Sequence, residues 1–159
     1  MQIPTLSDVI YIDMPNSYQK ISYDEGYSYG LSFFETILVK EQGIFLDSHV
    51  HRINQSLEKF NIPTHISLNL VESIIDHYKL KNLALKIQVS EKNILASTRP
   101  LTYSSDYYRR GVNLCYSGLV RSSDSLLIRH KSANYGDLIL TLKQSRQDGF
   151  DDCLFTNEH

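Results

Sequence analysis

The spacing of the apolar residues changes twice between Phe33 and Val89, and this change limits the folds that the chain can adopt. A run of β-forming residues at 33–39 is followed by a stretch with helical spacing, whose apolar members are Val50, Ile53, Leu57 and Phe60. From Leu83 to Val89 every second residue is apolar, as in a strand with one buried face. This order of strand, helix and strand predicts an α/β fold with a mixed sheet.

The segments before the first helix predict further strands and turns. Residues 8–12 are expected to form an edge strand, and residues 24–30, with Gly26 and Gly30, a turn-rich connection. Gly43 predicts a turn that returns the chain as a short partner strand at 44–46, in a hairpin with the 33–39 strand. We expect Asp47 or Ser48 to cap the helix that follows.

Between the two halves of the chain the pattern continues to alternate between helix and strand. Pro63 is expected to stop the first helix, and a second helix is predicted at 67–78. Residues 93–98 are predicted to form a strand next to the one at 83–89, and residues 112–116 another strand.

The last third of the chain predicts a second domain. Residues 117–125 are polar and are expected to form a loop or an interdomain linker. Beyond them the pattern predicts a short strand at 126–128, then a helix, and then a strand at 153–155. The helix has Tyr135, Leu138, Ile139 and Leu142 on one face, and Gly149 is expected to cap its end. We expect an N-terminal α/β domain at 1–119 and, at 120–159, a linker with the beginning of a second, β-rich domain.

The charge and hydropathy of the chain exclude several classes of partner. Lysine and arginine total 16 against 18 aspartate and glutamate residues, a formal net charge of -2, which gives no reason to expect nucleic acid or an anionic membrane. No segment approaches the roughly 20 apolar residues that a membrane span requires, and neither end has a targeting pattern. We expect a soluble, cytoplasmic protein.

The common signatures of metal and nucleotide sites are missing from the sequence. Cys115 and Cys153 are far apart and neither belongs to a Cys-x-x-Cys pair, so two reduced thiols are expected. His49 and His51 are two positions apart and do not share a helix face, so no metal site is expected. No glycine-rich dinucleotide or P-loop fingerprint is present. Any bound phosphate must therefore be held by another arrangement.

Lys131 is the candidate for covalent chemistry, because it lies between a predicted apolar strand and the start of a predicted helix. A lysine that reacts with a carbonyl carbon must be neutral part of the time, and burial or a neighbouring cation favours the neutral amine. Arg129 and His130 directly precede Lys131. An isolated lysine is usually an exposed surface residue, so the assignment depends on further motifs.

Four segments supply those motifs in a consistent order. Residues 29–37, YGLSFFETI, contain the pattern YG-x-x-x-FET, and residues 49–52, HVHR, contain H-x-x-R with Ile53 after it in place of leucine. Residues 85–98 form the predicted pair of central strands, and residues 130–135, HKSANY, contain K-[ST]-x-N-Y. Together these segments resemble the class IV aminotransferases, a family of enzymes that use pyridoxal phosphate.

The resemblance implies a fold type IV enzyme with pyridoxal 5'-phosphate as cofactor and a small-molecule amine as substrate. Lys131 matches the lysine that holds the cofactor and moves the substrate proton. Arg52 matches the arginine that pairs with the cofactor phosphate, a task that suits the planar guanidinium. Glu35 and Thr36 match family positions on the strand near the pocket, and His49 is expected to orient the helix or the phosphate neighbourhood. Members of the family are typically homodimers, so a homodimer is expected.

The resemblance leaves three functions open. The preferred one is 4-amino-4-deoxychorismate lyase, which forms 4-aminobenzoate and pyruvate in folate biosynthesis, because the region 61–82 is short and the sequence STRP follows the central strands, as in compact bacterial members. A branched-chain-type or D-amino-acid aminotransferase is the alternative, although Phe34 stands where the D-amino-acid enzymes are expected to have tyrosine. The chain stops at His159, before the expected strand that bears the glutamate for the pyridine nitrogen, so a truncated, non-catalytic member is the third.

Overall fold

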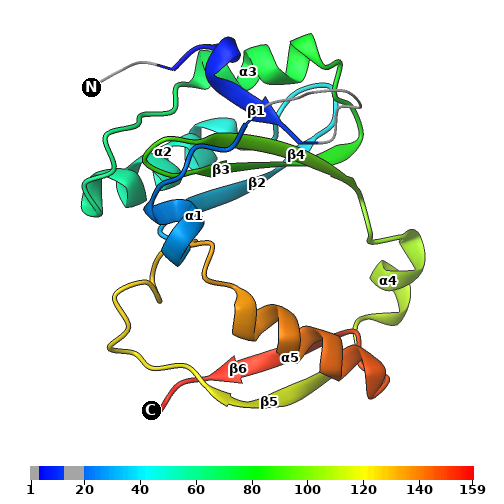
Figure 1. Ribbon diagram of the computed structural model, residues 1–159. Helices are drawn as coiled ribbons and strands as arrows, with labels where there is room; N and C mark the ends of the chain where they lie inside the picture. Colours follow the sequence, from blue (N-terminus) through cyan, green and yellow to red (C-terminus); the bar gives the residue numbers. More distant parts are fainter. Residues whose placement is uncertain (1–3, 13–19) are drawn as a thin grey trace. The chain divides into compact units, whose positions relative to one another are not determined.

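A computed structural model describes residues 4–12 and 20–159 of the chain (Figure 1). The chain forms two compact units, the first made of Met1–Leu101 with Lys131–Ala133 and the second of Thr102–His130 with Asn134–His159. The units therefore divide the chain near residue 101, whereas the predicted domain boundary at 119 falls within a strand of the second unit. That strand pairs with the last strand of the chain, which explains why the two segments belong to one unit.

The first unit contains a four-stranded mixed sheet in the order β1-β4-β3-β2. Its strands are β1 (Val9–Tyr11), β2 (Phe33–Val39), β3 (Leu83–Val89) and β4 (Ile94–Pro100). The strands β2, β3 and β4 are antiparallel neighbours, and β1 joins the edge of β4 in parallel. The predicted edge strand, the strand at 33–39 and the pair of central strands are confirmed.

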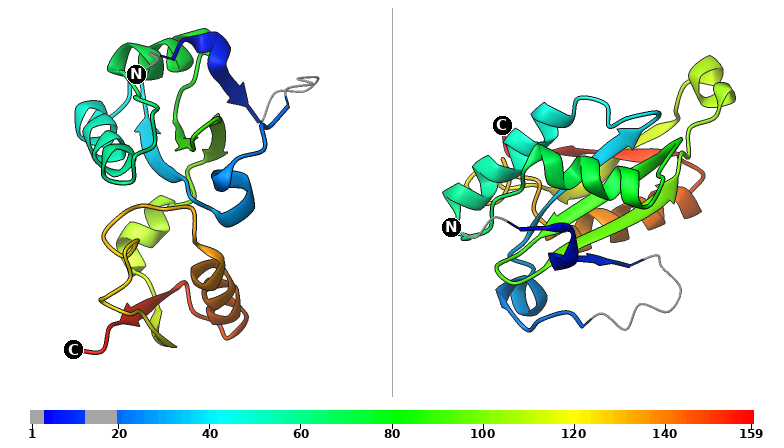
Figure 2. Two further views of the ribbon diagram at one scale, coloured as in Figure 1. Left: turned by 60° about the vertical axis from the view of Figure 1, so that its left-hand side comes forward. Right: turned by 90° about the horizontal axis from the view of Figure 1, so that it is seen from above.

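Two helices, α2 (Leu46–Lys59) and α3 (Leu68–His77), cover one face of this sheet (Figure 2). The apolar face predicted for α2 is buried at Val50, Ile53 and Leu57, and α3 buries Leu70, Val71, Ile74 and Ile75. The Ser67 hydroxyl accepts a hydrogen bond from the Leu70 N–H and caps α3 as expected of a serine at this position. Both predicted helices are confirmed.

Three local predictions near these elements are wrong. The predicted cap of α2 at Asp47 or Ser48 is replaced by Phe45, whose left-handed backbone (φ 53°) turns the chain into the helix two or three residues earlier. The same turn limits the predicted hairpin to an antiparallel bridge between Val39 and Gly43 and a hydrogen bond from the Ile44 N–H to the Leu38 carbonyl, and no strand forms at 44–46. The connection at 24–30 contains a short helix, α1 (Glu25–Tyr29), because the Asp24 carboxylate accepts the Tyr27 N–H at its start. A short 3-10 turn, η1 (Leu6–Asp8), precedes β1.

The second unit has two parallel strands, β5 (Leu114–Val120) and β6 (Asp152–Thr156), with α4 (Ser105–Arg110) and α5 (Gly136–Gln147). The predicted last helix and last strand are confirmed, and Gly149 has the positive φ of 89° expected after a helix end. The predicted strand at 126–128 is a series of turns, and residues 117–120 of the predicted linker belong to β5. Among the described residues no helix combines the length and apolarity that a membrane span needs.

Candidate functional site

Lys131 lies at the edge of the first unit's sheet, next to β2. The Phe34 N–H donates to the Lys131 carbonyl at 2.9 Å, and the Ala133 N–H donates to the Ser32 carbonyl at 2.8 Å. Between these two hydrogen bonds, Phe33 and Ser132 form an antiparallel bridge. Residues 131–133 therefore extend the sheet by one short segment, which fixes the backbone that carries the candidate lysine.

The side chain of Lys131 lies on the face of the sheet opposite α2. Side chains alternate between the two faces of a strand, and Glu35 contacts α2, so its neighbours Phe34 and Thr36 point to the other face. The Lys131 Nζ lies 4.7 Å from the centroid of the Phe34 ring, within the range of a cation–π contact. We call this side of the sheet the lysine face; strand register also places Lys86 and Ser97 on it.

Lys86 is a second cation at the same ring, and the sequence analysis did not select it. Its Nζ lies 4.4 Å from the Phe34 ring centroid. Burial, together with the charge of Lys131, lowers the pKa of Lys86 below that of an ordinary lysine. The alternation of β3 is the sequence signal that places Lys86 on the polar side of its strand, but only the register of the sheet shows that it meets Lys131.

Arg52 makes its contacts on the other face of β2, with Glu35. Its Nε and Nη2 donate to the two carboxylate oxygens of Glu35 at 2.5 and 2.6 Å, in a bidentate pair. His49 Nδ1 lies 2.8 Å from the same carboxylate, and His49 and Arg52 are three residues apart on α2. Glu35 is only 2% exposed, whereas the Arg52 side chain is 56% exposed. A buried carboxylate therefore holds an arginine that still reaches solvent.

The electrostatics of this cluster keep Glu35 ionised. Burial raises the pKa of Glu35, but hydrogen bonds from Arg52 and His49 and the charge of Arg52 outweigh it, so the pKa of this carboxyl lies below its ordinary value. The remaining guanidinium nitrogen of Arg52, Nη1, has no hydrogen bond to any residue in the part of the chain that the structure describes. That nitrogen is therefore available to an external anion.

The structure brings some of the predicted site residues together and leaves others apart. Glu35, His49 and Arg52 form one cluster, and Lys131 joins Lys86 at Phe34, as described above. Within residues 4–12 and 20–159, no hydrogen bond or ion pair joins Arg52 to Lys131. Thr36, on the lysine face, is a register partner of Lys86.

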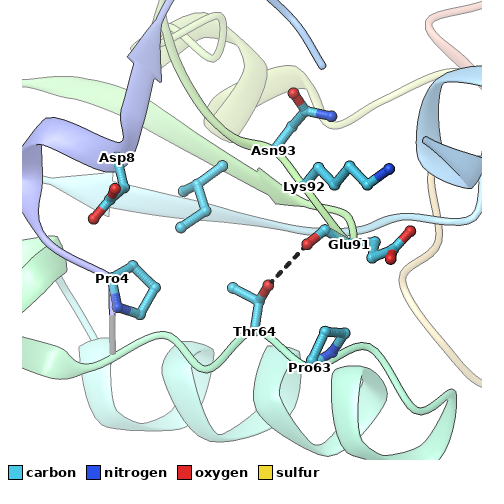
Figure 3. Close-up of a pocket in the computed structure, with 8 residues that line it drawn as sticks. Pro4, Asp8, Pro63, Thr64, Glu91, Lys92 and Asn93 are labelled. Carbon is cyan, nitrogen blue, oxygen red and sulfur yellow. Dashed lines mark hydrogen bonds between the residues drawn. The ribbon is translucent and has the colours of Figure 1, made fainter. Parts of the chain in front are cut away.

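A separate hollow of about 500 Å³ lies where the turn between β3 and β4 meets the connection between α2 and α3 (Figure 3). Pro4, Thr64 and Lys92 are among its lining residues, and the Thr64 hydroxyl donates to the Glu91 carbonyl across it. None of the predicted site residues lines this hollow. A search of the described residues for three clustered His, Cys, Asp or Glu side chains that could hold a metal ion finds no such group.

Comparison with known proteins identifies the fold. Residues 32–159 match the family model of the class IV aminotransferases. A comparison with curated proteins finds no match. A solved 4-amino-4-deoxychorismate lyase from Pseudomonas aeruginosa has a TM-score of 0.74 and 20% identity, covering 90% of this chain and 59% of its own.

Two further solved structures share this fold. A hypothetical aminotransferase from Mycobacterium tuberculosis in a pyridoxal-phosphate-bound form has a TM-score of 0.73 and 19% identity, covering 91% of this chain and 58% of its own. A protein from Legionella pneumophila, assigned as a 4-amino-4-deoxychorismate lyase, has a TM-score of 0.75 and 23% identity over 95% of this chain and 61% of its own. The chain thus spans roughly three fifths of the length of these structures, and at these identities the likeness shows a shared fold. Because the family model covers most of the sequence, the chain belongs to the class IV aminotransferases, a family of pyridoxal-phosphate-dependent enzymes with fold type IV.

Proposed function

We propose that the chain binds pyridoxal 5'-phosphate through Lys131 and Arg52, and that this is the cofactor site of a 4-amino-4-deoxychorismate lyase. The observation that carries the proposal is the position of the Lys131 amine. It comes from a segment anchored by backbone hydrogen bonds to β2, and its Nζ lies over the Phe34 ring with the second ammonium of Lys86 at the same ring.

The residues of the first unit fit the chemical groups of this cofactor. Lys131 offers an amine to the aldehyde carbon, and Arg52 offers the free Nη1 of its guanidinium to a phosphate oxygen. Glu35 holds Arg52 in one orientation, and His49 completes the set of hydrogen bonds to that carboxylate. Arg52, which Glu35 holds in place, supports binding of a ligand group that carries negative charge.

The proposed roles of the residues follow from this fit. Lys131 would hold the cofactor, and its Nζ, once the substrate amine has taken its place, would take the proton from the amine-bearing carbon. The bound cofactor supplies an electron sink that stores the electron pair of the broken bond. The Phe34 ring lies 4.7 Å from the Lys131 Nζ and so borders the space in which that amine would act.

The lyase and the aminotransferase share this proton removal and differ in the following step. In the lyase reaction the C–O bond to the enolpyruvyl group would break as the ring becomes aromatic, and the departing enolpyruvate would take up a proton to give pyruvate beside 4-aminobenzoate. In an aminotransferase, Lys131 would instead return the proton, the bound cofactor would supply the acceptor for the amino group, and water would release the keto acid. The names of the Pseudomonas and Legionella structures favour the lyase, and the Mycobacterium structure makes an aminotransferase the second candidate. A role in folate biosynthesis, a cytoplasmic location and a homodimer stay predictions.

Borohydride reduction of the purified chain with pyridoxal phosphate, followed by peptide mass mapping, tests the cofactor site. We expect a pyridoxyl group on Lys131 that is absent from Lys131→Ala and reduced several-fold in Arg52→Ala. Lys40→Ala is the matched control, because Lys40 is an exposed lysine of the first unit, and this variant should be labelled at Lys131 like the wild type. Labelling spread over surface lysines would contradict the proposal.

The products distinguish the two candidate reactions. Incubation with 4-amino-4-deoxychorismate and pyridoxal phosphate should release pyruvate and 4-aminobenzoate in equal amounts if the lyase assignment is right. Formation of a keto acid from an amino acid, without pyruvate release from 4-amino-4-deoxychorismate, would favour the aminotransferase. Both activities should be absent from Lys131→Ala.

A further inference from the structure

The two cysteines of the chain lie side by side in the second unit, although they are far apart in the sequence. Cys115 belongs to β5 and Cys153 to β6, and the two are register partners in this parallel pair, next to the partners Tyr116 and Leu154. Register partners on neighbouring strands carry their side chains on the same face of the sheet. Both cysteines are free thiols. The structure therefore places two unlinked thiols next to each other on one side of β5 and β6.

The spacing of the two strands suits a disulfide. Adjacent strands lie about 4.8 Å apart, and disulfides join cysteines whose Cα atoms are roughly 4.4 to 6.8 Å apart. In a parallel pair the two Cα–Cβ bonds point the same way, so the Cβ atoms also stay about 4.8 Å apart, beyond the mean of about 3.8 Å in disulfides. A bond formed here is therefore strained, and a strained disulfide is reduced more readily than a relaxed one.

Helix α5 lies against this pair of thiols, and the two differ in exposure. The Cys115 thiol donates a hydrogen bond to the Ser145 hydroxyl of α5 at 3.3 Å, and that hydroxyl donates to the Thr141 carbonyl at 3.0 Å. Ser145 is the buried residue of α5. Cys153 is only 9% exposed, whereas Cys115 is partly exposed. A small oxidant therefore reaches Cys115 first, and the shielded Cys153 is the neighbouring thiol that can react next.

We propose that Cys115 and Cys153 form a reversible redox pair, which a hydroperoxide oxidises to a disulfide between β5 and β6. The Cys115 sulfur, as a thiolate, attacks one oxygen of the peroxide, and the O–O bond breaks. The leaving oxygen takes up a proton, which gives a sulfenic acid on Cys115 and, from hydrogen peroxide, one molecule of water. The Cys153 sulfur then attacks the sulfenic sulfur, the S–O bond breaks, and a second molecule of water leaves. The two sulfurs lose two electrons, and the peroxide gains them.

This disulfide would join the first and the last strand of the second unit (Figure 1). The two strands form a sheet of their own, and a two-stranded sheet is marginally stable by itself. A cross-link between distant segments stabilises a protein mainly by restricting its unfolded chain. The closed loop would include Lys131, so the segment that carries the candidate cofactor lysine would be tied at both ends. The inference itself does not depend on cofactor binding.

Titration of the purified chain with hydrogen peroxide, followed by alkylation of the remaining thiols and peptide mass mapping without reductant, tests the pair. One equivalent of peroxide should remove both thiols and give a peptide pair joined through Cys115 and Cys153. An excess of reduced glutathione should restore both thiols, as expected of a strained bond. The oxidised chain should melt several degrees above the reduced chain.

Single variants test the order of the two steps. In Cys153→Ser a sulfenic acid should accumulate at Cys115, where dimedone traps it, because the second thiol is missing. In Cys115→Ser the dimedone adduct at Cys153 should form several-fold more slowly, because this thiol is buried. Equal trapping rates in the two variants would contradict Cys115 as the first thiol to react.

Cys153→Ser combined with Leu154→Cys is the matched control. Leu154 is the next residue of β6, so its side chain is on the opposite face from Cys153, and it is 44% exposed. The control keeps two cysteines at nearly the same separation in sequence, but their Cβ atoms point apart and cannot be bridged without backbone movement. Circular dichroism verifies that each variant is folded.

Four results would overturn the redox pair. These are a disulfide between two molecules, oxidation of Cys115 to a sulfinic acid while Cys153 stays free, equal cross-linking in the matched control, and a disulfide that glutathione leaves intact. A disulfide within one molecule that glutathione reduces, and that the matched control does not form, would support it.

Discussion

Arg52 and Glu35 form a bidentate ion pair whose two members differ widely in exposure. The carboxylate is buried beneath α2 and the guanidinium reaches solvent, with two nitrogen–oxygen distances of 2.5 and 2.6 Å. The glutamate cannot leave its position without exposing the core around it, whereas the arginine can. The buried glutamate therefore holds the exposed arginine in place. Substitution of Glu35 tests how strongly it does so.

Glu35→Gln is expected to lower the free energy of unfolding by about 2 kcal/mol, the size of the loss expected for a charged hydrogen bond in a buried setting. The loss should not be larger, because Arg52 regains water when its partner is removed. The variant should also weaken binding of pyridoxal phosphate but not of pyridoxal, since only the phosphate depends on a fixed Arg52. Urea denaturation and labelling of Lys131 with the two aldehydes measure these effects.

The matched control for this variant is Glu41→Gln. Glu41 forms an ion pair with Lys81, but both side chains are largely exposed, at 79% and 56%. Exposed ion pairs contribute between zero and about 1 kcal/mol, so this variant should unfold within about 0.5 kcal/mol of the wild type. Similar losses in both variants would mean that the buried position of Glu35 has no special effect on stability.

The two candidate cofactor residues could be predicted from the sequence, but their neighbours in the structure could not. Lys131 and Arg52 stand in short motifs that resemble a family, so their numbers could be assigned without coordinates. Lys86 stands in no motif, and its position beside Lys131 depends on how β3 is registered against β2 and on the return of residues 131–133 to the same edge. Strand register is set by contacts between distant segments, which a single sequence does not reveal.

Asp24 is the second carboxylate of the first unit that is buried with a complete set of donors. It accepts hydrogen bonds from the Tyr27 and Lys92 N–H groups, the Ser90 hydroxyl and the Asn93 amide, at 2.6 to 3.0 Å. Burial raises the pKa of Asp24, but these hydrogen bonds together outweigh it, and its pKa lies below the ordinary value. The carboxylate therefore ties α1 to the turn between β3 and β4 in its charged form.

Asp24→Asn should reduce the free energy of unfolding by about 2 kcal/mol at pH 7, because an amide presents one acceptor where the carboxylate presents two. Since the folded pKa is lowered, this stabilisation is fully present above the ordinary aspartate pKa of about 3.9 and is lost as the pH falls through the folded value. The difference between wild type and variant, measured by urea denaturation from pH 7 to pH 2, should shrink only below about pH 4. A difference that is independent of pH would show that the charge of Asp24 does not contribute.

Gly26 lies in the same region, where α1 packs closely against Ser90. A Cβ atom at this position would lie 2.3 Å from the Ser90 Cβ, which no side-chain rotation can relieve. Gly26→Ala is expected to destabilise the protein by about 1 to 3 kcal/mol, the cost of overpacking. Gly136→Ala, at the start of α5 where nothing lies within 4 Å, should instead be neutral or stabilising by up to about 1 kcal/mol. Thermal unfolding of both variants measures the contrast, and equal shifts would contradict the packing seen at Ser90.

The elements that sequence periodicity predicted incorrectly have local causes. The hairpin predicted at 44–46 is reduced to an antiparallel bridge between Val39 and Gly43 and a hydrogen bond from the Ile44 N–H to the Leu38 carbonyl, because α2 begins at Leu46 and leaves no residues to extend it. Residues 126–128 form turns. The positive φ of Phe45 could not be predicted from the sequence, because phenylalanine rarely adopts this backbone conformation. Long amphipathic segments such as α2 and α3 were predicted well because their burial is decided by local spacing.

Ala133 tests whether the attachment of residues 131–133 to β2 is what places the candidate lysine. Its N–H donates to the Ser32 carbonyl at 2.8 Å, and proline at this position removes the donor. Ala133→Pro should therefore reduce borohydride-dependent labelling of Lys131 by pyridoxal phosphate several-fold. The segment lies at the edge of the sheet, so the free energy of unfolding should fall by only about 1 kcal/mol.

Ala133→Gly separates the hydrogen bond from the side chain at the same position. Glycine keeps the N–H and removes only a methyl group, so this variant should label at Lys131 close to the wild-type level, with a small loss of stability from its greater freedom in the unfolded chain. If the proline and glycine variants label equally well, the backbone hydrogen bond to Ser32 does not position Lys131. If the proline variant alone loses labelling while its circular dichroism is unchanged, the edge segment positions the amine independently of the rest of the sheet.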